Sequence, residues 1–129
     1  MMTDEFDHIS AALTGDKRAV LKDQLQRLER EVVERLLIDV LTRAAVEGEV
    51  TDIRGEIIRL QPREGQGDDP VARRDRLALE KERADLTKEL RTEQRDCWRD
   101  VQELKREERQ VEKELLTVHQ RDRRLREFE

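Results

Sequence analysis

The stretch from Val71 to Phe128 contains neither glycine nor proline, and it is rich in Leu, Glu, Lys and Arg, which all favour helix. A chain without these two residues has no strong local signal to turn or to end a helix. Its apolar residues recur at spacings of three and four, the pattern of a narrow coiled-coil seam. The seam residues are Cys97, Val101, Leu104, Val111, Leu115, Val118 and Leu125, with Gln94, Glu108 and Asp122 as polar members. We therefore expect one long helix over residues 71–128.

A second long helix is predicted upstream of this stretch. Its apolar residues follow the same spacing, at Leu21, Leu25, Leu28 and Val32. Thr14 and Gly15 interrupt the helical pattern before it, and Asp16 then suits the N-cap position. We therefore expect a helix over residues 16–47, preceded by a short amphipathic segment at residues 1–15.

The segment that follows, residues 48–61 (GEVTDIRGEIIRLQ), fits two structures. Its apolar residues keep helical spacing, which would continue the first helix as a bent helix. Gly48 and Gly55, however, would each cost a helix interior about 1 kcal/mol, and the β-branched residues around Arg54 and Gly55 fit two short strands about a tight turn. The turn chemistry favours a small β-hairpin at residues 49–61, and the bent helix stays open as the alternative.

Residues 62–70 hold two Gly and two Pro and form a predicted loop, in which Asp68 and Asp69 are placed to cap the second helix. Two long helices joined by such a loop can fold back on each other as neighbours. The predicted fold class is mainly α, a long antiparallel helical hairpin or coiled coil. We expect it to form a single elongated domain over residues 1–129.

A helix, a β-hairpin and a second helix, in that order, resemble a prefoldin β-type subunit, and the sequence VTDIRGEIIRL carries this resemblance. It implies strands that assemble into a shared barrel, paired helices that project from it, and the function of a holdase chaperone. A second resemblance lies in DDPVARR, residues 68–74, which is similar to the acidic coiled-coil tip of factors that enter the secondary channel of RNA polymerase. It implies a nucleic-acid- or polymerase-associated regulator.

The first helix carries more apolar side chains than one partner helix can bury. These side chains spread widely around the helix between residues 32 and 46. We therefore expect this region to meet two neighbours. The predicted protein-interaction residues here are Val33, Leu36, Leu37 and Leu41.

On the second helix, Trp98 adjoins the seam, where an indole either covers the core of the hairpin or anchors another chain. Asp100, Glu107 and Glu114 form an acidic row at heptad spacing beside the same seam, at positions where coiled coils select charged partners. We predict these four residues as further protein-interaction residues.

Composition narrows the classes of function. Charged residues make up 46% of the chain, and the mean hydropathy is −0.97, so a thick globular core is excluded. The net charge is −5 with the signs interspersed, and only three residues are aromatic, so the sequence argues against nucleic acid as a partner. We find no motif for a catalytic, cofactor or metal site, since His8, Cys97 and His119 are isolated from one another in sequence.

Cys97 is the only cysteine, and the sequence shows neither a signal peptide nor a membrane span. We expect a cytoplasmic protein, or a component of a particle assembled inside a cell, with no membrane partner. The predicted function is that of a non-enzymatic structural or adaptor protein, which oligomerises through its coiled-coil helices and scaffolds a larger protein assembly. Its expected partners are itself and another protein.

Overall fold

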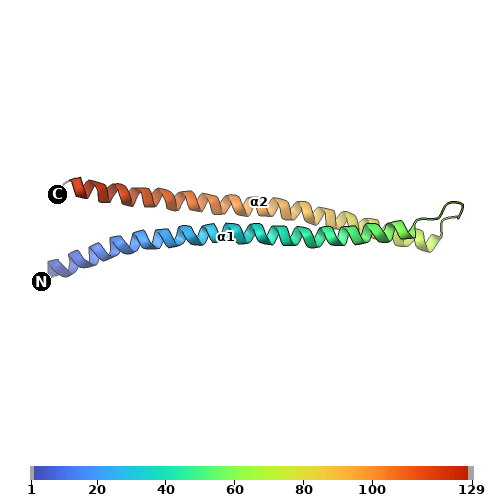
Figure 1. Ribbon diagram of the computed structural model, residues 1–129, viewed down its shortest axis with the longest axis horizontal. Helices are drawn as coiled ribbons and strands as arrows, with labels where there is room; N and C mark the ends of the chain where they lie inside the picture. The colour runs from blue at the N-terminus through green and yellow to red at the C-terminus, as the bar shows by residue number, and fades with distance from the viewer. Residues whose placement is uncertain (1, 128–129) are drawn as a thin grey trace. The chain divides into compact units, whose positions relative to one another are not determined.

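The computed structural model describes the backbone of residues 2–127 and the side chains of residues 15–127. It contains two helices, α1 (Met2–Leu60) and α2 (Pro70–Glu127), and residues 61–69 connect them (Figure 1). The backbone described contains no strand. The predicted fold class, a mainly α helical hairpin, is confirmed.

The chain divides into two compact units, and the first combines Met1–Glu34 with Asp100–Glu129. Its core consists of apolar side chains that α1 and α2 contribute at heptad spacing: Leu21, Leu25, Leu28, Leu104, Val111, Leu115 and Val118. All of them are predicted seam residues. Asp122, a predicted polar member of the seam, forms an ion pair with Arg18 across the two helices. Leu125 is the exception, because its side chain is exposed.

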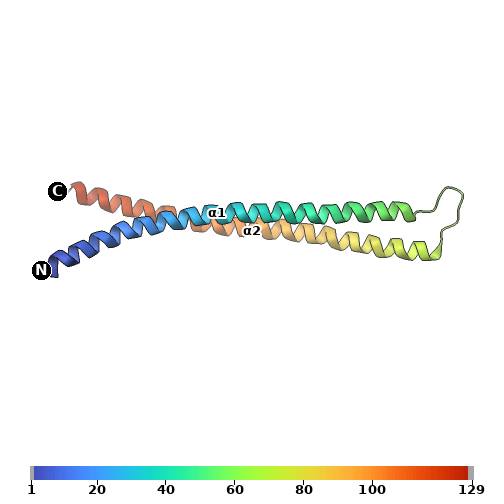
Figure 2. The ribbon, with the colours of Figure 1, turned by 60° about the horizontal axis from the view of Figure 1, so that its bottom comes forward.

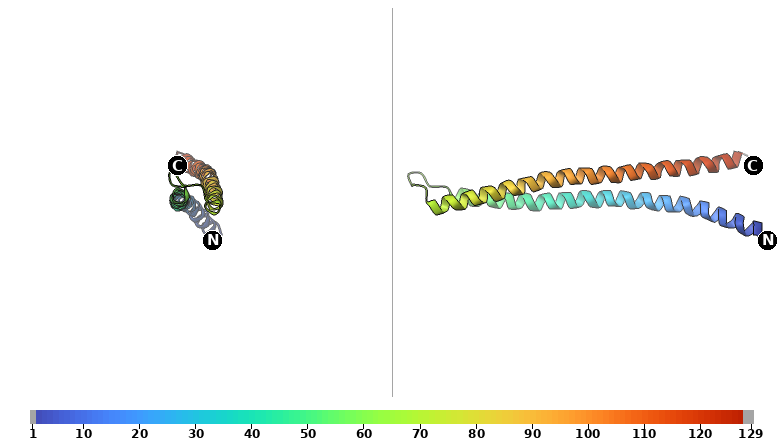
Figure 3. Two further views of the ribbon diagram at one scale, coloured as in Figure 1. Left: turned by 90° about the vertical axis from the view of Figure 1, so that its right-hand side faces the viewer. Right: turned by 180° about the vertical axis from the view of Figure 1, so that it is seen from behind.

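The second unit is the continuous segment Arg35–Arg99. In it the two helices lie side by side and run in opposite directions, and the loop joins them at one end (Figures 2 and 3). Its apolar core is Ile53, Ile57 and Leu86, with Val46, Val50 and Leu79 packed against it. This core lies at the loop end of the unit.

The favoured β-hairpin at residues 49–61 is wrong, because α1 is helical to Leu60. Helical spacing places Ile53 and Ile57 on one face, where both are buried against Leu86 of α2. Burial of such side chains stabilises by about 1.5–3 kcal/mol each, which exceeds the cost of about 1 kcal/mol for each glycine in a helix. Gly55 has no positive φ in this helix. The resemblance to a prefoldin subunit rested on two strands in this segment, which is helical instead.

The break predicted at Thr14 and Gly15 is also wrong. The backbone of α1 is helical through both residues, so Asp16 lies inside the helix and is not its N-cap. One glycine costs a helix about 1 kcal/mol, which is not enough to end it when the flanking residues favour helix. The division of the chain into a separate segment 1–15 and a helix 16–47 therefore gives way to one helix.

The ends of the loop follow local rules. Pro62 disfavours helical geometry in the residue before it, and α1 ends at Leu60. At the other end Pro70 takes the first position of α2, where its missing N–H is not needed. The Asp69 carboxylate caps this helix by accepting a hydrogen bond of 3.1 Å from the backbone N–H of Val71, as predicted.

Candidate protein-interaction surface

The seam of α1 changes from apolar to polar in the second unit. The spacing of three and four that passes through Leu28 and Val32 continues through Arg35, Asp39 and Thr42 before it returns to Val46. The structure follows this continuation, because Asp39 is buried, with 6% of its surface exposed, and Arg35 reaches α2. Polar side chains therefore occupy the intramolecular face of α1 in the region that the sequence marks as most apolar.

Charged groups in this polar part of the seam pair with one another. Arg35 Nη1 donates a hydrogen bond of 2.7 Å to Glu93 Oε1 of α2. Arg43 Nη2 lies 2.8 Å from Asp39 Oδ2, an i,i+4 ion pair within α1. Asp39 Oδ1 and Arg43 Nε are nevertheless buried without a hydrogen-bond partner among the described residues. A seam of this kind gains less from packing than one lined with leucine.

Cys97 of α2 is buried beside these charges. Burial raises the pKa of its thiol above the ordinary value, and the negative charge of Asp39 acts in the same direction. A thiol with a raised pKa carries little thiolate at neutral pH and is a poor nucleophile. This environment fits the predicted role of Cys97 as a small seam residue.

The apolar side chains of the same region lie on the opposite side of α1. Helical geometry places residues 37, 40 and 44 about 180° around the helix from the seam positions 35, 39 and 42. We call this surface of the second unit the outer face, and it consists of exposed residues: Leu36, Leu37, Val40, Leu41, Ala44, Gly48 and Thr51. Leu37 and Leu41 are 56% and 61% exposed. Exposed apolar residues that gather on one face, in place of being scattered singly, often mark an interaction site.

The outer face contains three of the four residues predicted on the first helix, namely Leu36, Leu37 and Leu41. Val33, the fourth, is likewise exposed and belongs to the first unit. The width of the apolar region alone did not show which side of the first helix α2 covers. Continuing the heptad phase from Leu28 through Arg35 and Asp39 would have shown it.

Trp98 is 67% exposed. The interpretation in which its indole covers the core of the hairpin is therefore wrong for the isolated chain. An exposed indole of this size is a suitable anchor for another chain, and that role stays a prediction.

The acidic row lies beside the interface of the two helices in the first unit. Glu107 lines a shallow depression together with Gln24, and Glu114 lines a second depression together with Lys17. Asp100 is partly buried. Both glutamates are exposed to solvent, and their selection of another chain stays a prediction.

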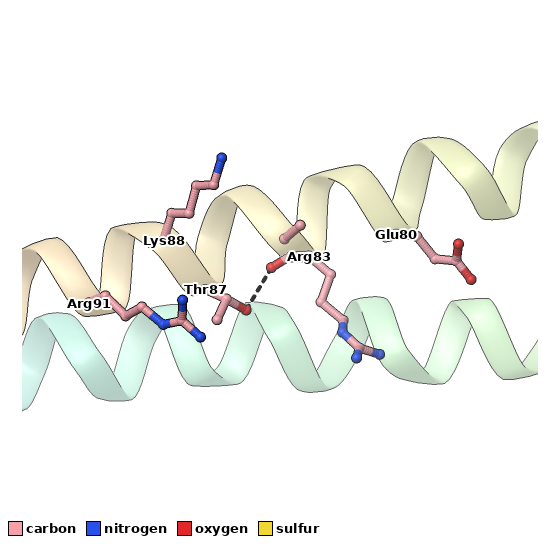
Figure 4. A pocket seen from close by; sticks show the side chains of 6 residues that line it. Glu80, Arg83, Thr87, Lys88 and Arg91 are labelled. Atoms are coloured by element: carbon pink, nitrogen blue, oxygen red, sulfur yellow. Dashed lines mark hydrogen bonds between the residues drawn. The ribbon is translucent and has the colours of Figure 1, made fainter.

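One depression in the second unit, of about 470 Å³, is lined only by residues of α2 (Figure 4). Arg83, Lys88 and Arg91 bring three positive charges to it, and the Thr87 hydroxyl donates its hydrogen bond to the carbonyl oxygen of Arg83. A depression formed by one helix has no opposing wall to enclose a ligand. We do not assign a small-molecule site to it.

Among the side chains of residues 15–127, no group of three or more His, Cys, Asp or Glu could hold a metal ion. Within the described part of the chain, no helix has a stretch long and apolar enough to cross a membrane.

The two aspartates that resemble an acidic coiled-coil tip have intramolecular partners. Asp69 caps α2, and both carboxylate oxygens of Asp68 accept hydrogen bonds from Arg76 Nη2, at 2.8 and 2.6 Å. The loop therefore uses both carboxylates to fix the start of α2. This arrangement favours the capping interpretation of DDPVARR over a tip that inserts into an enzyme.

Fold and surface together define a two-helix coiled-coil hairpin with an uncovered apolar face on its first helix. Comparisons with protein-family models, with curated proteins and with solved structures gave no match to this chain.

Proposed function

We propose that this chain is a non-enzymatic structural or adaptor protein, which oligomerises through its coiled-coil helices and scaffolds a larger protein assembly in the cytoplasm or in a particle. The outer face is the surface that binds a helix of another chain. Its exposed apolar residues are the single observation that carries the proposal.

A helix is the kind of partner that the outer face fits best. Leu37, Val40 and Ala44 follow the four-three spacing of a coiled-coil seam, and a helix can pack its own side chains between such residues. The interspersed charges around the outer face would form the polar rim of the interface. Trp98 is a second candidate contact, for a partner that also reaches α2.

The test compares matched leucine variants of the full chain. Leu41→Glu places a charge on the outer face, whereas Leu116→Glu places one on a leucine of α2 with similar exposure, 58% against 61%. Native size and co-purifying proteins are measured for both variants and for the unaltered protein. Loss of assembly or of a specific co-purifying protein in Leu41→Glu alone supports the proposal. If both variants keep the native size and the same co-purifying proteins, the outer face is not an assembly surface.

A further inference from the structure

The side of α2 that points away from α1 carries a row of positive charges in the second unit. The seam of α2 in this unit includes Leu79, Leu86 and Cys97. A residue two positions from a seam residue lies about 200° around the helix from it, and therefore on the opposite side. At heptad spacing, the residues in this position are Arg74, Lys81, Lys88 and Arg95, and all four are exposed. We call these four residues the basic ridge, and Figure 4 shows its Lys88 side chain pointing away from α1.

Two further rows at heptad spacing flank the basic ridge and add little negative charge. One row consists of Leu77, Ala84, Arg91 and Trp98, and the other of Ala78, Asp85, Thr92 and Arg99. Asp85 is the only acidic residue in these three rows. The other acidic residues of α2 in this unit lie nearer to α1, where Glu93 pairs with Arg35. Charges that are interspersed along the sequence are therefore separated around the helix.

The basic ridge contributes nothing to the fold of the isolated chain. Within the part of the chain whose side chains the structure describes, none of its four residues forms an ion pair. Arg91 lies three residues after Lys88 and four residues before Arg95, so three cations are neighbours on the helix surface. Like charges at these spacings destabilise a helix.

From this arrangement we infer that the basic ridge binds the phosphate backbone of a DNA duplex, independently of base sequence. The inference goes beyond the proposed function, because it concerns a different surface and a different kind of partner. The ridge extends over roughly 30 Å from Arg74 to Arg95, at about 1.5 Å per residue. A duplex carries one negative charge per about 1.7 Å of its axis, so a row of cations of this length can contact several phosphates.

The side chains beside the basic ridge favour this partner over a membrane or another protein. A helix that lies on a membrane buries a broad apolar face. A protein interface has an apolar core inside its polar rim. The large apolar residues of the flanking rows are Leu77 and Trp98, which lie roughly 30 Å apart along the helix and form neither surface.

A single strand of nucleic acid is a poorer partner than a duplex. Proteins bind single strands largely by stacking the bases on aromatic side chains. Trp98 is the only aromatic residue of the second unit. The basic ridge supplies charge without stacking, which is what contact with a duplex backbone requires.

The negative net charge of the chain does not prevent this contact. At physiological ionic strength, exposed charges farther apart than about 8 Å are largely screened from each other. A helix with its side chains is about 10–12 Å across. A phosphate on the basic ridge is therefore attracted by the ridge more than it is repelled by carboxylates on the far side of α2.

The experiment measures binding of the full chain to a fluorescent DNA duplex of about 20 base pairs, by anisotropy between about 50 and 200 mM salt. The test variant combines Lys81→Gln, Lys88→Gln and Arg95→Gln. We expect its dissociation constant at the lowest salt to rise by at least about tenfold. The slope of log affinity against log salt concentration should become shallower by about 2–3, because up to three phosphate contacts are lost. Glutamine favours helix, so circular dichroism should show unchanged helix content.

The matched control combines Lys17→Gln, Lys22→Gln and Arg54→Gln on α1. It removes the same three positive charges from exposed residues outside the basic ridge. We expect its dissociation constant to stay within about twofold of that of the unaltered protein. A chain that does not bind the duplex at about 50 mM salt, or equal weakening in both variants, would overturn the inference.

Two further probes test the choice of partner. The same assay is run with a single strand of the same length, and flotation is measured with vesicles of phosphatidylcholine and phosphatidylserine. We expect weaker binding to the single strand and no flotation with the vesicles. Binding to vesicles without binding to the duplex would assign the basic ridge to a membrane surface, and tighter binding to the single strand would exclude the duplex as its partner.

Discussion

Arg35 of α1 and Glu93 of α2 form an ion pair of 2.7 Å in the second unit, and both side chains are largely shielded from water. Hydrogen bonds between charged groups are stronger when they are shielded in this way. The ion pair lies in a stretch of the seam where Asp39 stands in place of an apolar residue. It therefore supplies part of the contact between α1 and α2 that leucine packing supplies elsewhere.

Removal of Glu93 should therefore destabilise the protein more than removal of a surface carboxylate. We expect Glu93→Ala to lower the free energy of unfolding by about 1–2 kcal/mol, because Arg35 loses a shielded charged partner. Glu31→Ala removes the exposed partner of Arg27, at 3.9 Å, and should cost no more than about 0.5 kcal/mol. Urea unfolding of both variants measures the difference, and equal losses would contradict the importance of the shielded pair.

Replacement of Asp39 by leucine should stabilise the protein. The Asp39 carboxylate is buried with one oxygen unsatisfied, so its removal relieves the cost of desolvating a charge that is only partly compensated. Arg43, whose side chain is 41% exposed, can turn toward water when it loses Asp39. The free energy of unfolding is measured for Asp39→Leu and for Asp52→Leu, which replaces an exposed aspartate of the same helix and should change stability only slightly. A loss of stability in Asp39→Leu would show that the carboxylate is required.

Cys97 should make stability depend on pH in the alkaline range. Burial raises the pKa of its thiol in the folded chain above that in the unfolded chain, which is about 8.5. The protonated thiol is therefore favoured by folding: its contribution is fully present below the unfolded pKa and is lost as pH rises through the folded pKa. Between about pH 8 and pH 10 the unaltered protein should lose more stability than Cys97→Ala, which has no thiol to ionise. Urea unfolding at each pH gives the free energy of unfolding of both proteins. If it changes with pH equally in both, Cys97 has no such effect.

Two glycines should respond to alanine with opposite signs. Gly55 lies inside α1, and the nearest atom to an added Cβ is Arg59 Nη2 at 3.9 Å, so Gly55→Ala should stabilise by about 0.5–1 kcal/mol. Gly65 in the loop has a φ of 82°, so Gly65→Ala should destabilise by about 1 kcal/mol. The unfolding midpoints are compared at one low protein concentration. A stabilised Gly65→Ala or a destabilised Gly55→Ala would contradict this assignment.

The parts of the fold that depend on short-range patterns could be predicted from the sequence. Leu21 and Leu28 signal their seam through heptad spacing alone, and Asp69 signals its cap through the proline that follows it. Both signals are local, and local energies decide both outcomes.

The choice between hairpin and helix at Gly55 could not be made in this way. It depends on the burial of Ile53 and Ile57 against Leu86, which is distant in sequence. For the candidate site, the sequence predicted that the region with Leu37 and Leu41 has more apolar side chains than one helix can cover, and that α2 would cover some of them. Both leucines are exposed in the structure. The heptad phase of the seam places Asp39, and not these leucines, against α2. Phase outweighs composition because a continuous helix cannot change the face that lies against its partner within two turns.

The middle of the loop between the two helices contributes little to holding them together. α2 begins at Pro70 with Asp69 as its cap, and Asp68 is hydrogen-bonded to Arg76 of that helix. Residues 62–67 are exposed. They hold one internal backbone hydrogen bond, from the N–H of Gln66 to the oxygen of Arg63. Extra residues in such a loop add only slowly to the entropy of closing it. This stretch is accordingly a permissive insertion point, where a peptide tag, a fluorescent domain or a naturally acquired module can be spliced into the chain while both helices keep their native ends.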